Sequence, residues 1–270
     1  MVAYLSAALV VVVFLFGYDV WAVLGSMLGR DGAAFVPVAA AVLVPICAIL
    51  TLRARLTRWG LGQWLALVGC AALIAAALLL CDGDFPAKRT HVVEYVLVSL
   101  LVRKGACRHA GSWALTISTL VIASLFGIHD ELAQGLHPQR TFGLPDIEVD
   151  VLAASAGALL GHGVGLFQGG ADSGRPEMGV WAFATGALGL GVGLMVVGLW
   201  ATGVRLPDLS LAPPPHLWTV APVLGGGIAL LVVDWPERPW LRHLLEMSVA
   251  LALSMPLYLV MPHVTSLVFR

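Results

Sequence analysis

The sequence predicts an all-α fold, a polytopic transmembrane bundle of about nine helices. The first observation is composition: 59% of the residues are hydrophobic and 11% are charged, whereas soluble domains carry roughly 25% charged residues. The second is that the apolar residues form continuous runs, long enough to cross a hydrocarbon core of about 30 Å as helices. These runs lack the alternation of apolar and polar residues that membrane β-strands show, so helices are expected throughout.

The first apolar run is expected to stay in the mature protein. No basic residues precede it, and it is longer than the roughly 7 to 15 residues of a signal-peptide core. The run at 86–102 is the most polar, because Lys88, Arg89, His91 and Glu94 lie in its first half. The predicted spans are 3–28, 33–52, 61–81, 86–102, 112–133, 147–168, 178–202, 217–233 and 241–262.

Three parts are predicted along the chain. N-terminal spans occupy 1–60, a four-helix unit occupies 61–168, and C-terminal spans occupy 169–270. The proline-rich stretch 204–216 is expected to be an extended, stiff connector within the last part. The frequent glycines of 185–198 indicate close helix packing and not a phosphate-binding loop.

The lysines and arginines between the spans predict the orientation in the membrane. Nine of the 15 fall in the even-numbered connections, which are therefore expected to be cytoplasmic, with the N-terminus inside. The connections around 82–90 and 130–146 are separated by two spans and must open on the same side. That side is predicted to be extracytoplasmic.

Several classes of function are excluded or disfavoured. A net charge of −1 does not suit nucleic acid, whose phosphates need a clustered basic surface. The four cysteines lack paired spacing and are interpreted as small apolar packing residues and not as metal ligands or disulfides; they are Cys47, Cys70, Cys81 and Cys107. No cofactor is predicted.

Polar residues concentrate in 82–150, which holds 8 of the 16 acids and 6 of the 15 basic residues. Helical spacing would place Lys88, His91 and Tyr95 on one face. In the next helix Asp130 and Gln134 are i, i+4 partners, with Glu131 beside them.

The helix that follows would carry a single stripe of acids and then small residues, formed by Asp146, Asp150, Ala153, Gly157 and Gly161. Its small part would let a neighbouring helix or a lipid-like ligand lie close. Arg140 lies on the connection before it. The acids outnumber Lys88 and Arg140, which implies protonated carboxyl groups with raised pKa values, or a bound cation.

Two interpretations of this stretch stay open. It is either a polar network that sets helix register near the headgroups, or a functional site, since ionisable groups in a membrane are functional hypotheses by default. The set Asp130, Glu131, Asp146 and Asp150 with His91 could supply the ligands of a metal. No metal is predicted, however, because no H-E-x-x-H or paired-histidine spacing supports one. Ser99 and Ser155 have no arrangement typical of a nucleophile. The remaining histidines, including His162 and His243, are expected to be packing or interfacial residues, while His91 and His137 are ambiguous.

The order K-x-x-H-x-x-x-Y, D-E-x-x-Q and R-x-x-x-x-x-D-x-x-x-D before a glycine-spaced helix resembles the VanZ-like membrane protein family, over about 61–168. Two positions depart from the family pattern. Asp150 stands where the family usually has Asn, and Ala87 stands where it usually has Asp. The first departure puts in doubt any role that needs a neutral amide there.

The resemblance implies a bacterial cytoplasmic-membrane protein of the cell envelope, in a family named for a protein associated with teicoplanin resistance. We expect a polar site at the membrane boundary that binds a lipid-linked envelope precursor or another polar headgroup. One alternative is a membrane enzyme that uses the same residues as general acid and base; another is a structural or accessory subunit that binds a membrane protein partner. The predicted site residues are Lys88, His91, Tyr95, Asp130, Glu131, Gln134, Arg140, Asp146 and Asp150.

Overall fold

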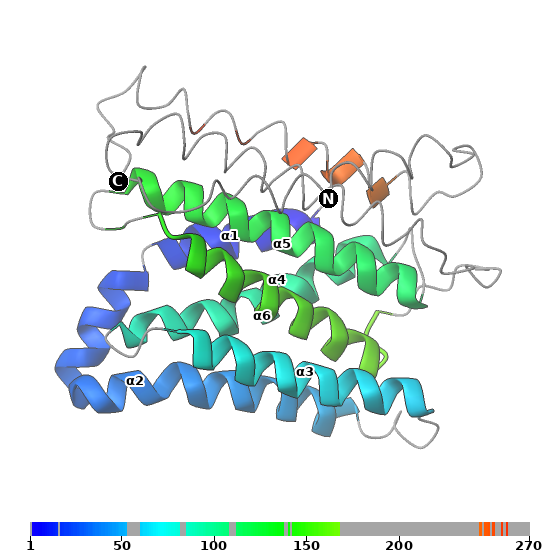
Figure 1. The fold of residues 1–270 in the computed structure, drawn as a ribbon, viewed down its shortest axis with the longest axis horizontal. Helices are drawn as coiled ribbons and strands as arrows, with labels where there is room; N and C mark the ends of the chain where they lie inside the picture. The colour runs from blue at the N-terminus through cyan, green and yellow to red at the C-terminus, as the bar shows by residue number, and fades with distance from the viewer. Residues whose placement is uncertain are drawn as a thin grey trace, which may run out of the picture.

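The computed structural model describes residues 2–15, 17–52, 60–81, 85–107, 112–137, 140 and 142–167, with single positions between 243 and 258. Every element of regular structure that spans these ranges is a helix, which confirms the all-α prediction (Figure 1). The helices are α1 (Val2–Leu15), α2 (Gly17–Leu52), α3 (Leu61–Leu80), the short 3-10 helix η2 (Pro86–Arg89), α4 (Thr90–Ala106), α5 (Ser112–Leu136) and α6 (Leu144–Gly163).

Three helices of the described part are long and apolar enough to cross a membrane: Val20–Thr51, Leu61–Leu80 and Trp113–Leu136. The six spans predicted for this part are therefore not supported as such. The 14 residues of α1 are too few, since a span needs about 20, while α4 and α6 each carry at least three charged residues. The predicted spans 178–202 and 217–233 lie outside the described residues, as does most of 241–262.

The structure assigns the predicted first span, 3–28, to two elements. One helix ends at Leu15 and the next begins at Gly17. At the boundary expected near residues 29–32, Gly29 has the non-helical angles φ 73° and ψ 170°, and two helical segments of α2 meet there at a kink. Glycine adopts this backbone conformation without the steric cost that a Cβ atom imposes, so the chain continues as helix on both sides of Gly29.

Large apolar side chains cover the outer face of α3. Trp64, Leu65 and Val68 are 56%, 61% and 65% exposed. A soluble protein rarely leaves so continuous an apolar surface in water, whereas hydrocarbon accommodates it at no cost. Most of α5, by contrast, is buried. Together these features are those of a membrane-associated bundle with α3 on its outside and α5 inside.

Helix α6 packs against α3, α4 and α5. A Cβ atom at Gly157 would lie 2.7 Å from Ser99 Cβ and 2.8 Å from the Val96 carbonyl oxygen, so this glycine allows α4 and α6 to touch backbone to backbone. Ser99 Oγ donates to the Ala154 carbonyl at 2.8 Å across the same contact. Helix α4 thus packs against the small residues of the predicted stripe. The sequence had allowed either a neighbouring helix or a lipid-like ligand at this position.

The predicted span 86–102 leaves Arg103 in the connection that follows, which was expected to be cytoplasmic, and this placement in a connection is wrong. It lies on α4 and is fully buried. Its Nε donates to the Leu166 carbonyl at 2.7 Å and its Nη1 to Thr116 Oγ1 at 3.2 Å. Gly161 provides the space, since a Cβ atom there would lie 2.5 Å from Arg103 Cδ.

Candidate functional site

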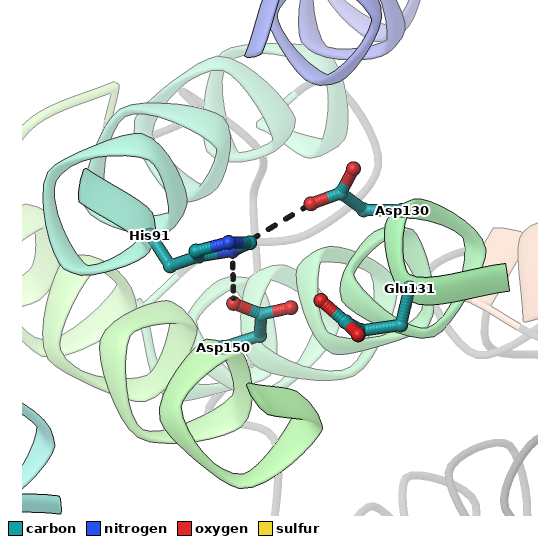
Figure 2. A group of neighbouring side chains, drawn as sticks. All are labelled: His91, Asp130, Glu131 and Asp150. Atoms are coloured by element: carbon teal, nitrogen blue, oxygen red, sulfur yellow. Dashed lines mark hydrogen bonds and ion pairs between the residues drawn. The ribbon is translucent and has the colours of Figure 1, made fainter. Parts of the chain in front are cut away.

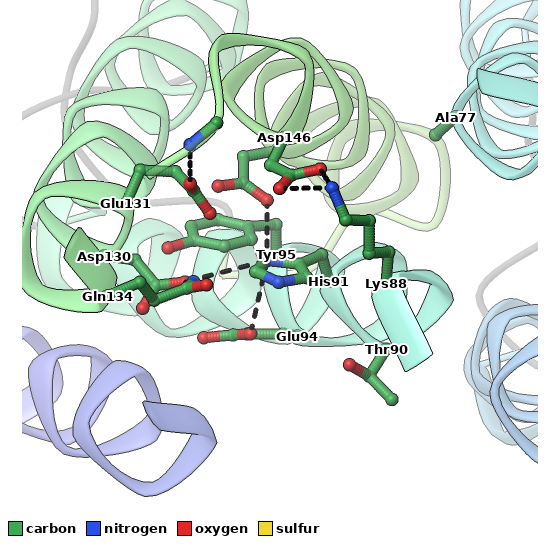
Figure 3. Close-up of polar contacts among 12 residues, drawn as sticks. Ala77, Lys88, Thr90, His91, Glu94, Tyr95, Asp130, Glu131, Gln134 and Asp146 are labelled. Carbon is green, nitrogen blue, oxygen red and sulfur yellow. Dashed lines mark hydrogen bonds and ion pairs between the residues drawn. The ribbon is translucent and has the colours of Figure 1, made fainter. Parts of the chain in front are cut away.

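Three helix ends meet at one end of the bundle and bring their polar side chains together (Figure 3). These ends are the beginning of α4 with η2, the end of α5 and the beginning of α6. The segments predicted to open on the same side of the membrane are therefore adjacent. We call the group the polar cluster; it consists of Lys88, His91, Glu94, Tyr95, Asp130, Glu131, Gln134, Arg140, Asp146 and Asp150.

Local sequence explains why the helices begin here. Pro86 opens η2 and a proline stands in the first turn of α6, positions where the missing amide hydrogen costs nothing. Asp146 also lies in the first turn of α6, where the helix dipole favours negative charge. The amide of Gly143 donates to Glu131 Oε2 at 3.0 Å and so joins α5 to the start of α6.

His91 is the centre of the polar cluster and is buried. Its Nδ1 lies 3.1 Å from Asp150 Oδ1, 3.6 Å from Asp130 Oδ2 and 3.9 Å from Glu94 Oε2. A ring nitrogen carries at most one hydrogen, so it can donate to only one of these carboxylates. The shortest contact assigns that hydrogen bond to Asp150.

Glu94 is a member that the sequence analysis left out of the predicted site. It lies three residues after His91 on α4, and its side chain is 1% exposed. The i, i+3 spacing to His91 was the available signal. It was passed over because Glu94 does not share the expected Lys88 face.

Tyr95 and Gln134 hold the cluster in shape. The Tyr95 ring lies parallel to that of His91, with 6.5 Å between centroids, and its hydroxyl donates to the Phe126 carbonyl at 3.3 Å. Gln134 Nε2 donates to Asp130 Oδ2 at 2.8 Å, which confirms the predicted i, i+4 pair. Each residue therefore positions a neighbour on its own helix: Tyr95 lies against His91 on α4, and Gln134 bonds Asp130 on α5.

Lys88 stands at the rim and pairs with Asp146, with its Nζ 2.8 Å from both carboxylate oxygens. It belongs to η2 and not to the helix of His91, so the three-residue face predicted for Lys88, His91 and Tyr95 does not form as one helix. This pair bridges η2 and α6. It also means that the charge of Lys88 is already balanced by Asp146.

Arg140 occupies the other side of the rim and is half-buried. Its guanidinium donates to Gln134 Oε1, and Nη2 lies 3.4 Å from His91 Nε2. Among the described residues, no carboxylate oxygen lies within salt-bridge distance of it. Arg140 is thus a cation at the edge of an acidic interior that contacts no carboxylate directly among the described residues.

The interior holds more negative than positive groups. Glu94, Asp130, Glu131 and Asp150 are each at most 1% exposed, and Lys88 is engaged by Asp146. Only His91 and Arg140 of the cluster remain to balance four carboxyl groups. Charges buried without compensation are costly, so protons or a bound cation must account for the difference.

The other histidines mostly follow the packing expectation. His162 stacks on Trp113 and contacts Thr116 Oγ1, and His243 contacts the Tyr4 hydroxyl. His109, His216 and His263 lie outside the described residues. His129 was not singled out from the sequence; its Nε2 contacts the Leu251 carbonyl at 2.9 Å, joining α5 to the C-terminal part.

Comparisons with known proteins found no match among family models, curated proteins or solved structures. The resemblance to the VanZ-like family therefore stays a prediction from the polar motifs.

Proposed function

We propose that this chain is a VanZ-like, multi-pass protein of the bacterial cytoplasmic membrane with a cytoplasmic N-terminus. Its role would be to bind the anionic headgroup of a cell-envelope lipid at the rim of the polar cluster, in cell-envelope or glycopeptide-antibiotic-related biology. The observation that carries this proposal is Arg140, half-buried at the rim and without a carboxylate in salt-bridge distance among the described residues.

The chemistry of Arg140 supports an anionic group. A guanidinium presents a rigid fork of N–H donors that matches the oxygens of phosphate or carboxylate, and such bonds are shorter and stronger than neutral ones. One edge of this fork is already oriented by Gln134. The partial exposure of Arg140 leaves it open to a ligand from outside the bundle.

The surroundings support a lipid as the source of that group. The apolar outer faces of α2 and α3 suit hydrocarbon, and the rim lies at one end of the same bundle (Figure 1). A headgroup at the rim would leave its acyl or prenyl chain along such a face. A free anion in water would gain nothing from these surfaces.

Native mass spectrometry of the purified chain tests the proposal. We expect a polyprenyl phosphate to bind at least tenfold more tightly than the matching neutral prenol, and Arg140→Ala to remove this difference. Lys104→Ala is the matched control, because it deletes an exposed cation from the far end of α4. Equal binding of phosphate and prenol by the unaltered protein would refute the proposal.

An enzyme is a second function that one observation favours. His91 has Asp150 on Nδ1, while its Nε2 faces the rim. A carboxylate that orients a histidine in this way is typical of general acid–base sites. Release of a labelled headgroup by the purified protein, absent in His91→Gln and present in Lys104→Ala, would establish it; no release from any envelope lipid would exclude it.

A further inference from the structure

We infer that the interior of the polar cluster is a binding site for a divalent metal ion, ligated by His91, Asp130, Glu131 and Asp150 (Figure 2). The inference goes beyond the proposed headgroup site and does not depend on it. It also differs from the expectation drawn from sequence, which found no metal-binding spacing. The sequence offered these residues as possible ligands, but no spacing motif supported a site, because the ligands come from three separate helices, α4, α5 and α6.

The geometry of the four side chains is close to that of a coordination sphere. One ligand atom from each residue can be chosen so that all four lie within 4.8 Å of one another. In a tetrahedral site, metal–oxygen and metal–nitrogen bonds of about 2.0 to 2.2 Å place the ligand atoms about 3.3 to 3.6 Å apart. The ligand atoms would therefore have to draw together by about 1 Å, a movement that rotation of the carboxylate side chains can supply.

Two buried carboxylate oxygens without hydrogen-bond partners support the metal site independently. Among the described residues, Glu131 Oε1 and Asp150 Oδ2 are buried and accept no hydrogen bond. Figure 2 shows these two carboxyl groups turned toward each other beside His91. A buried polar atom without a partner costs roughly 1 to 3 kcal/mol, and more when it is charged. Because His91 Nδ1 donates to Asp150 Oδ1, it satisfies neither oxygen.

A divalent cation would satisfy the oxygens and offset the surplus charge together. The donor set is three carboxylates and one imidazole, which suits Mn²⁺, a hard ion, or Zn²⁺, a borderline one, better than soft Cu⁺, whose preferred ligands are sulfur. Magnesium is less suited because it favours all-oxygen sites and retains its waters.

Metal binding would change the hydrogen bonds of His91. With Nδ1 on the ion, Nε2 carries the ring hydrogen and can no longer accept from Arg140. The guanidinium would then keep only Gln134 Oε1 as its partner and be freer to hold an anion at the rim. The metal would thus change the hydrogen bonds of Arg140 at the rim by fixing which nitrogen of His91 carries the hydrogen.

The test loads the full-length chain, purified in detergent and stripped with a chelator, with Mn²⁺ or Zn²⁺ alone. We expect one ion per chain by elemental analysis after removal of excess metal, and a higher thermal unfolding midpoint in the loaded protein. Glu131→Gln and Asp150→Asn should each weaken binding at least tenfold. Glu148→Gln is the matched control, because it removes an exposed carboxylate two residues from Asp150 on the same helix.

Measurements on the unaltered protein are sufficient to overturn the inference, so the test does not depend on whether the variants fold. Absence of stoichiometric Mn²⁺ and Zn²⁺, with no change in unfolding midpoint, would show that protons balance the acids. Binding that Glu131→Gln and Asp150→Asn leave unchanged would place the ion elsewhere and overturn it too. No lipid is present, so either outcome leaves the headgroup proposal to be judged by its own experiment.

Discussion

His91 Nδ1 lies 3.1 Å from Asp150 Oδ1, although 59 positions separate the two residues. The contact joins α4 to α6 at the depth where both side chains are buried. Asp150 is also the position where the resembled family usually carries Asn. A neutral amide there would bond to the imidazole without adding charge, so the acid changes the electrostatics of the cluster more than its shape.

The metal-free protein should tolerate the loss of this acid. In Asp150→Asn a buried carboxylate is replaced by a neutral group of nearly the same shape, so we expect an unfolding midpoint equal to or above that of the chelator-treated parent. Thermal unfolding in detergent with a chelator measures it. Asp146→Asn is the comparison, because it removes the partner of Lys88 and should lower stability by up to about 1 kcal/mol. A large loss of stability in Asp150→Asn would show that its charge is compensated without metal.

The contact between α4 and α6 depends on Gly157. A methyl group at this position meets backbone atoms of Val96 at 2.8 and 3.0 Å, which cannot move aside as a flexible side chain would. We expect Gly157→Ala to destabilise the protein by about 1 to 3 kcal/mol, measured by denaturant or thermal unfolding. Gly62→Ala, on α3 with nothing within 4 Å of the added atom, should be neutral or stabilising by about 0.4 to 1 kcal/mol. Equal effects of the two changes would contradict the close packing.

Arg103 should be important for stability at the opposite end of the bundle. Lysine has one nitrogen and cannot reach both the Leu166 carbonyl and Thr116 Oγ1, so Arg103→Lys should cost about 2 kcal/mol. Lys104→Arg, an exposed neighbour on the same helix, should change stability by less than about 0.5 kcal/mol. Unfolding midpoints of the two variants, compared directly, check this prediction.

The outer face of α3 should contact lipid. A nitroxide attached at Val68→Cys, where the native side chain is 65% exposed, should be reached by oxygen and shielded from a water-soluble nickel complex. A nitroxide at Glu148→Cys, near the rim, should show the reverse preference. Accessibility measurements in lipid nanodiscs distinguish the two sites. Equal access of the nickel complex to both would argue against a membrane-embedded α3.

Sequence reasoning located the polar stretch because helical periodicity is local. The pair Asp130 and Gln134 follows from i, i+4 spacing alone, and the structure forms it. The stripe of small residues around Gly157 also follows from helical spacing. The sequence did not decide whether a helix or a ligand would pack against it. The packing of α4 onto this stripe settled that choice.

Span boundaries were less predictable, because hydropathy does not record backbone geometry. The run 3–28 is continuous in apolar character, yet its helix ends at Leu15. Gly29, with its positive φ, separates two helical segments of α2 at a kink. From the sequence, Arg103 was placed in a connection because it is charged, and its burial in the bundle cannot be seen from hydropathy.

The sequence by itself determined the helical class, the apolar character of the outer helices and the chain segment that carries the ionisable groups, since all three follow from composition and period. Only the tertiary structure decided which of these groups meet. Lys88 turns out to be paired with Asp146, Glu94 joins the cluster, and four ligand atoms from three helices lie within 4.8 Å of one another. The physical reason is that ligand geometry depends on helix crossings, which are set by contacts between residues distant in sequence.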